Sequence, residues 1–105
     1  MPINSREKGR RGEAELAALF REYGYADARR GQQYHGGPDS PDVVNALPGI
    51  HIECKRVEKL NIDDALAQAE RDCGENTPAV FHRKNRTEWK VTMYLDDFMR
   101  LYKGE

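Results

Sequence analysis

Apolar residues recur along this chain with two different periods, which separate helical from extended segments. Leu16 and Phe20 lie in a stretch where apolar side chains return at helical spacing, and this predicts a helix over residues 7–24. Asn61 is a residue type that caps helices, and it precedes a second helical pattern over residues 61–73. The chain is therefore expected to begin with one helix and to carry another in its middle.

Shorter apolar runs with a period of two lie between and after these helices. They predict five strands, over residues 25–33, 42–46, 50–57, 79–83 and 89–94. Arg29 and Arg30 interrupt the first of these strands. Asp96 or Asp97 then begins a short final helix that carries Phe98 on its apolar side.

The predicted order of elements, α-β-β-β-α-β-β-α, indicates the fold class. Helices interspersed with strands in this way pack on a mixed sheet, so we expect an α/β (α+β) fold. The 105 residues supply one modest core. Residues 1–105 are therefore expected to form a single domain, with residues 1–5 loose at its start.

Charged residues make up 33% of the chain and nearly cancel, which leaves a formal net charge of −1. Basic residues gather in four clusters, over residues 6–11, 29–30, 55–59 and 83–86, whereas acidic residues gather in the second helix and near the C-terminus. Each cluster taken alone is consistent with an ordinary solvated surface. Four of them around one candidate site favour a molecule with a basic face and an acidic face.

Two further features of the composition limit the function classes. The chain has no apolar run of membrane-spanning length and no secretory signal, so we expect a cytoplasmic protein with no membrane partner. Its two cysteines form no CxxC pair. Its three histidines lack the spacing of zinc ligands, which argues against a structural zinc site.

The candidate chemistry lies between Asp42 and Lys55. Glu53 and Lys55 are two residues apart on the third predicted strand, so their side chains project from one face while Cys54 points into the core. If Asp42 lies on the neighbouring strand, two carboxylates and one ammonium converge. Such carboxylates repel unless a cation lies between them, and oxygen ligands suit Mg²⁺. The alternatives are an exposed aspartate at a strand start and a salt bridge on the wet face of a sheet.

The spacing of Pro41-Asp42 and Glu53-Cys54-Lys55 resembles the signature of the PD-(D/E)XK nuclease superfamily. The stretches 8–16 and 23–25 resemble the opening helix of archaeal-type Holliday junction resolvases and their phage-borne relatives. Residues 80–86 and the tryptophan that follows resemble the later strand pair of small phage members. The resemblance covers residues 5–102, nearly the whole chain.

This resemblance implies a restriction-endonuclease-like core and a set of roles. Asp42 and Glu53 would bind Mg²⁺, for which Mn²⁺ would substitute, and the backbone carbonyl of Cys54 would be the third ligand. Lys55 would orient or help to deprotonate the attacking water. Glu13 continues the apolar stripe of the first helix and matches the helix glutamate of the resolvases, which touches metal directly or through water. The alternative for Glu13 is a first-turn glutamate favoured by the helix dipole.

Several other polar side chains are candidates for supporting roles. Arg83 resembles a basic residue of the fourth strand in the family and would bind the scissile phosphate, or else lie in solvent. Other candidates would contact phosphates without reading bases: Arg10, Arg11, Arg29, Arg30, Lys84 and Arg86. His51 shares the face of Glu53 and either lines the cleft or, as we prefer, makes a structural bond. Gln68 matches a site-supporting glutamine of some relatives, and no role is predicted for His82.

We therefore expect a magnesium-dependent endodeoxyribonuclease, nearest in resemblance to a Holliday junction resolvase of phage or prophage origin that acts on branched DNA. Paired incisions require two active sites, so a homodimer is expected. Tyr94, Phe98, Met99 and Tyr102 are a possible dimer surface or else part of the core. Two other readings stay open: a phage nicking, flap or end-processing nuclease, and a non-catalytic DNA-binding module of the same fold.

Overall fold

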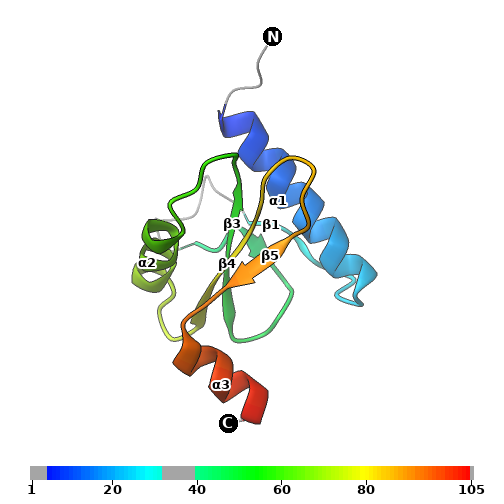
Figure 1. Ribbon diagram of the computed structural model, residues 1–105. Helices are drawn as coiled ribbons and strands as arrows, with labels where there is room; N and C mark the ends of the chain where they lie inside the picture. The colour runs from blue at the N-terminus through cyan, green and yellow to red at the C-terminus, as the bar shows by residue number, and fades with distance from the viewer. Residues whose placement is uncertain (1–4, 32–39, 105) are drawn as a thin grey trace.

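The computed structural model describes residues 5–31 and 40–104, and these residues form three helices and two small sheets. The elements are α1 (Ser5–Glu22), β1 (Arg29–Arg30), β2 (Val43–Val44), β3 (Ile50–Arg56), α2 (Ile62–Asp72), β4 (Thr77–Arg83), β5 (Lys90–Thr92) and α3 (Leu95–Lys103). This order and the mixed α and β class confirm the prediction (Figure 1). Residue 5, expected to be loose, already belongs to α1, and residues 1–4 lie outside the described part of the chain.

The larger sheet is mixed and has the order β3-β4-β5. The strands β3 and β4 run parallel, and β5 returns antiparallel to β4. The smaller sheet pairs β1 with β2 in antiparallel fashion. A hydrogen bond from the Asp42 N–H to the Ile52 carbonyl, 2.9 Å long, connects the start of β2 to β3.

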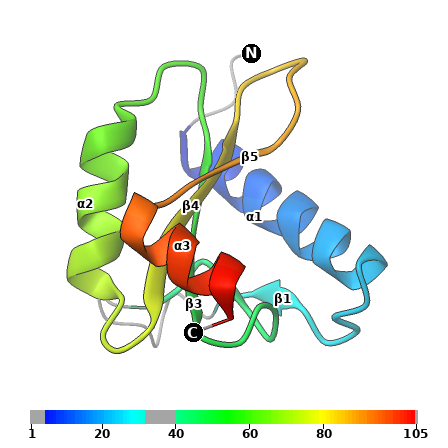
Figure 2. The ribbon, with the colours of Figure 1, turned by 60° about the horizontal axis from the view of Figure 1, so that its bottom comes forward.

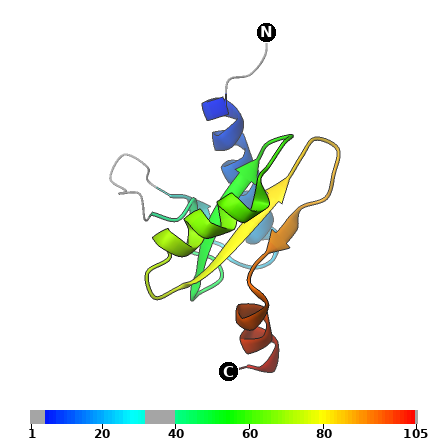
Figure 3. The ribbon, with the colours of Figure 1, turned by 60° about the vertical axis from the view of Figure 1, so that its left-hand side comes forward.

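The helices α1 and α2 cover opposite faces of the larger sheet (Figure 2). Figure 3 shows α2 crossing in front of β3 and β4. Ile52 and Cys54 of β3 are buried on the α1 side against Phe20, whereas Val80 of β4 is buried with Leu66 of α2. The period of two along β3 therefore separates a core face from the face that carries Glu53 and Lys55, as predicted.

Local sequence signals explain where the middle helix begins and how closely the first one approaches the sheet. The side chain of Asn61 accepts a hydrogen bond of 3.1 Å from the Asp64 N–H and caps α2, as predicted. Gly12 faces Arg56 of β3 so closely that a Cβ at this position would overlap the Arg56 Cβ. Gly12 therefore allows α1 to lie directly against β3.

Several predicted boundaries and burials are wrong. Within the described residues β1 spans only two residues, because the arginines at 29 and 30 leave little apolar surface there. The last helix begins at Leu95, with Tyr94 and not an aspartate at its N-cap. Tyr23 falls inside the predicted helix over residues 7–24, but it lies just after the end of α1 and is 81% exposed.

The helix α3 lies at the opposite end of the molecule from the start of α1 (Figure 1). It contains no buried residue, so its apolar side chains are not part of the core. Phe98 is 47% exposed and Tyr102 is 78% exposed. In the part of the chain that the structure describes, none of the helices has the length and apolar character needed to cross a membrane.

Candidate active site

Asp42 is held at the start of β2 by three hydrogen bonds. Its N–H donates to the Ile52 carbonyl and its own carbonyl accepts from the Gly31 N–H, each over 2.9 Å. Its side-chain Oδ2 accepts from the Cys54 N–H over 2.8 Å. Gly31 allows this arrangement, because a Cβ there would overlap the carbonyl oxygen of Pro41. The carboxylate therefore lies beside β3, as the sequence predicted.

Glu53 and Lys55 project together from the α2 face of β3. Glu53 is buried, and its Oε2 lies 3.6 Å from Lys55 Nζ. His51 is also buried on this face, with Nε2 at 3.5 Å from Glu53 Oε1. Among the described residues His51 Nε2 has no hydrogen-bond partner, so the structural bond preferred for this histidine is not found at that atom. The imidazole instead lines the site beside Glu53.

The carboxyl group of Asp42 titrates far from its ordinary range. Burial, and after it the negative charge of Glu53, raise the pKa of Asp42 from 3.8 to about 7. Glu13 adds to this rise, whereas the Cys54 N–H and the Lys55 ammonium oppose it. The other three side chains predicted for catalysis, Glu13, Glu53 and Lys55, therefore all act electrostatically on Asp42.

Cys54 contributes its backbone and not its thiol. In a strand, the N–H and the carbonyl of one residue point to the same side. Because the Cys54 N–H points to Asp42, the Cys54 carbonyl faces the same edge of β3, where the third oxygen ligand was predicted. Burial and the nearby carboxylates raise the pKa of the thiol well above its usual range, so it stays protonated and unreactive.

Glu13 lies close enough to raise the pKa of Asp42, but its carboxylate is engaged. Arg30 Nε donates to Glu13 Oε1 over 3.1 Å, in a partly buried ion pair. The pair joins α1 to β1 and fixes the glutamate beside the site. Arg30 was predicted to contact phosphate, and that role would now require it to leave Glu13.

Glu15, two residues after Glu13 in α1, has a definite function in packing. Its Oε1 accepts from Trp89 Nε1 over 2.9 Å and lies 3.2 Å from Arg83 Nη1. The Arg83 guanidinium also lies 5.9 Å from the centre of the Trp89 ring. This cluster joins α1 to β4 and the start of β5, so Arg83 has structural partners and is not simply in solvent. The only signal in the sequence is that the indole N–H of a partly buried tryptophan usually finds an acceptor.

The remaining basic candidates lie on the surface. The exposed residues among them are Arg10, Arg11, Arg29, Lys84 and Arg86. Glu58 brings three of the basic clusters together, since its carboxylate is 3.6 Å from Lys8 Nζ and accepts from the Asn85 N–H over 2.7 Å. The first turns of α1, the segment after β3 and the β4–β5 loop therefore share one end of the molecule (Figure 1). Gln68 is exposed on α2.

The donor set at Asp42 suits a hard cation with few protein ligands. Among the described residues no three His, Cys, Asp or Glu side chains are grouped so as to hold a metal ion. Mg²⁺ is commonly bound through one or two carboxylates and keeps several waters. Asp42, Glu53 and the Cys54 carbonyl are a ligand set of this kind. No family model, curated protein or solved structure matches this chain.

Proposed function

We propose that this chain is a magnesium-dependent endodeoxyribonuclease of the PD-(D/E)XK type that cleaves branched DNA as a Holliday junction resolvase. The observation that carries the proposal is the meeting of Asp42 and Glu53 beside Lys55. One carboxyl group has its pKa raised to about 7 partly by the charge of the other. The repulsion between these two carboxylates does not stabilise the protein, and a divalent cation bound between them would remove it.

Each residue of the site has a distinct part in hydrolysis. Asp42 and Glu53, with the Cys54 carbonyl, would hold the ion, which lowers the pKa of water and offsets charge on the phosphate. The ammonium of Lys55, 3.6 Å from Glu53, would orient the attacking water and approach the non-bridging phosphate oxygens. Glu13, kept in place by Arg30, would support the ion through water.

The distribution of charge supports DNA as the substrate. The basic segments that meet around Glu58 and Lys8 lie at one end of the molecule, and α3, whose first turn is acidic, lies at the other (Figure 1). Arginine and lysine contacts to phosphates position DNA without reading its sequence. Recognition through phosphates favours a nuclease that responds to the shape of its substrate.

A resolvase must cut two strands, and α3 offers a surface for a second copy of the chain. Its exposed apolar stripe is formed by Leu95, Phe98, Met99 and Tyr102. The first turn of α3 is acidic and the last turn is basic. Two copies of α3 packed antiparallel about a two-fold axis would place each acidic end against the basic end of the partner, which favours an identical chain as the occupant.

The proposal is tested by incubating the wild type, Asp42→Ala and Glu53→Gln with labelled four-way junction, flap and linear duplex, with and without Mg²⁺. Glu75→Gln, at an exposed position, is the matched control for the loss of a carboxylate. We expect symmetric nicks in the junction only when Mg²⁺ is present. Both site variants should lose at least ~100-fold in rate, because each removes a group that stabilises charge in the transition state.

The alternative functions give different results in the same assay. Equal cutting of all three substrates would keep the nuclease and discard the resolvase. Junction binding without any metal-dependent cutting would leave a non-catalytic binding module and overturn the proposal. Activity in Asp42→Ala equal to that of Glu75→Gln would move the chemistry away from this site.

A further inference from the structure

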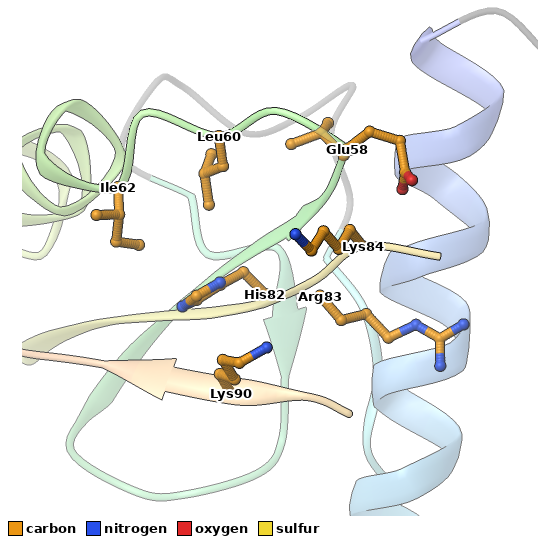
Figure 4. Close-up of a pocket in the computed structure, with 8 residues that line it drawn as sticks. Glu58, Leu60, Ile62, His82, Arg83, Lys84 and Lys90 are labelled. Atoms are coloured by element: carbon orange, nitrogen blue, oxygen red, sulfur yellow. The ribbon is translucent and has the colours of Figure 1, made fainter. Parts of the chain in front are cut away.

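A cavity of about 310 Å³ lies at the end of the sheet where β3 and β4 finish. Its lining is apolar on one side and basic on the other, and consists of Val57, Glu58, Leu60, Ile62, His82, Arg83, Lys84 and Lys90. Figure 4 shows Leu60 and Ile62 on one wall, with His82 and Lys90 facing them from β4 and β5. None of these residues is among the four predicted for catalysis, whereas Arg83 and Lys84 were predicted to contact phosphate.

The cavity is connected to the active site by the register of the sheet. Lys55 pairs with His82 across β3 and β4, and His82 pairs with Lys90 across β4 and β5. Residues paired in this way project from the same face, so three basic side chains form one row that begins beside Glu53. Neighbouring strands are about 4.8 Å apart, which places Lys90 roughly 10 Å from Lys55 at the backbone.

Two of the charged residues around the cavity are engaged elsewhere. Arg83 and Glu58 extend toward α1 (Figure 4). Arg83 pairs with Glu15, and Glu58 lies near Lys8 and accepts from the Asn85 N–H. The negative charge of Glu58 is therefore directed away from the opening.

The ammonium groups of Lys84 and Lys90 are left on the cavity side. In Figure 4 both amines point toward the space beside His82. Within the described residues neither lysine has an ion-pair partner. The His82 ring is held by a 2.8 Å hydrogen bond between Nε2 and Thr92 Oγ1. Burial, and after it the positive charge of Lys90, lower the pKa of His82.

We infer that this cavity binds a backbone phosphate of the DNA strand that is cut at Asp42 and Glu53, and this inference rests on the proposed function. Lys84 and Lys90 supply the charge, and the His82 ring supplies a polar contact between them. A strand that rises about 3.4 Å per nucleotide covers the row from Lys55 to Lys90 with about three nucleotides. The apolar wall of Leu60 and Ile62 is suited to a deoxyribose next to that phosphate.

The test compares Lys84→Gln and Lys90→Gln with Arg71→Gln, which removes the same charge from an exposed position on α2. Binding of labelled junction is measured by fluorescence anisotropy over a range of salt concentrations, with Ca²⁺ in place of Mg²⁺. Each cavity variant should bind about 3- to 10-fold more weakly at low salt. The slope of log K against log salt should fall by about 1, as expected for one lost phosphate contact.

Cleavage by the same variants separates this inference from the proposed function. At DNA concentrations below saturation the cavity variants should cut more slowly than Arg71→Gln, because they bind the junction more weakly. If the wild type cuts and both cavity variants bind like Arg71→Gln, the inference is wrong and the proposed function stands. If the wild type binds no DNA, both are wrong.

A competition arm distinguishes DNA phosphate from a small anion. Inorganic phosphate should displace DNA from the wild type no better than chloride at equal ionic strength. Inorganic phosphate that bound the wild type but not Lys90→Gln, and left the bound DNA in place, would make the cavity a site for a free anion and overturn its assignment to the DNA strand.

Discussion

The backbone of Asp42 is hydrogen-bonded to Ile52 and Gly31, and its carboxylate accepts from the Cys54 N–H, yet the carboxyl group is partly removed from water and lies near the charge of Glu53. Its pKa of about 7 in the folded chain lies above the ordinary value of 3.8, so the folded state retains a proton that the unfolded state has lost between these two pH values. The free energy of unfolding of the metal-free protein should therefore fall as the pH rises from about 4 to about 7.

Asp42→Asn removes this ionisation while keeping an oxygen that can accept from the Cys54 N–H. In EDTA we expect the variant to melt at a higher temperature than the wild type, with a gain at pH 8 that exceeds the gain at pH 5 by about 1 kcal/mol or more. For a domain of this size that is roughly 4–8 °C. Thermal unfolding followed by circular dichroism at the two pH values measures it.

The control for this prediction is Asp27→Asn, because Asp27 is exposed. It should change the melting temperature equally at both pH values. Adding Mg²⁺ at pH 8 should raise the melting temperature of the wild type, because an ion that binds only the folded state stabilises it. It should have little effect on Asp42→Asn, which lacks the carboxylate ligand. A gain from Asp42→Asn that does not vary with pH would contradict the raised pKa.

At the scale of elements, the position of α1 depends on how closely it can approach β3. Gly12→Ala would place a methyl group on the Cβ of Arg56, so the helix or the strand must move. We expect a loss of about 1–3 kcal/mol in the free energy of unfolding. Gly9, one turn earlier in α1, has no heavy atom near its would-be Cβ. Gly9→Ala should instead stabilise the protein by about 0.5–1 kcal/mol, since alanine favours helix.

Urea unfolding of both alanine variants measures whether the free energy of unfolding falls for Gly12→Ala and rises for Gly9→Ala. Because the two substitutions are chemically identical and lie in the same helix, helix propensity cannot explain a difference between them. If Gly12→Ala also stabilised the protein, α1 would lie farther from β3 than the structure places it.

The same elements show how far the sequence predicts the structure. The helix boundaries near Asn61 and the division of β3 into a core face and a polar face follow from local patterns, and both are confirmed. Asp42 beside Glu53 follows from strand spacing. The ion pair of Glu15 with Arg83 joins residues far apart in the chain, so no local pattern predicts it. Likewise, the pairing of Lys55, His82 and Lys90 in one row depends on the strand register, which forms only when the sheet assembles.

For the whole molecule, the pattern of α3 predicts an apolar stripe but not what covers it. The stripe is exposed, and Tyr94 ties the start of the helix to α2 through a 3.1 Å hydrogen bond to Glu70. A helix anchored at its start, with an uncovered apolar face, is suited to docking a second copy. The dimer of the proposed resolvase would use this surface.

Phe98→Asp tests that surface without disturbing the core, since Phe98 is 47% exposed. Placing a charge in the centre of the stripe should weaken self-association by at least ~30-fold, which corresponds to about 2 kcal/mol. Sedimentation velocity over a range of protein concentrations measures this. The wild type should sediment as a dimer where the variant is a monomer. With four-way junction, the variant should make single nicks where the wild type makes paired ones.

Tyr23→Asp is the matched control, because it places the same charge at an exposed aromatic residue just after α1. It should leave the dimer intact, so that loss of association can be traced to α3 and not to a more acidic surface. Equal dissociation of both variants would point to a general effect of charge. A wild type that stays monomeric at every concentration, but still makes paired nicks, would mean that the junction itself brings two copies together and that the stripe on α3 has another occupant.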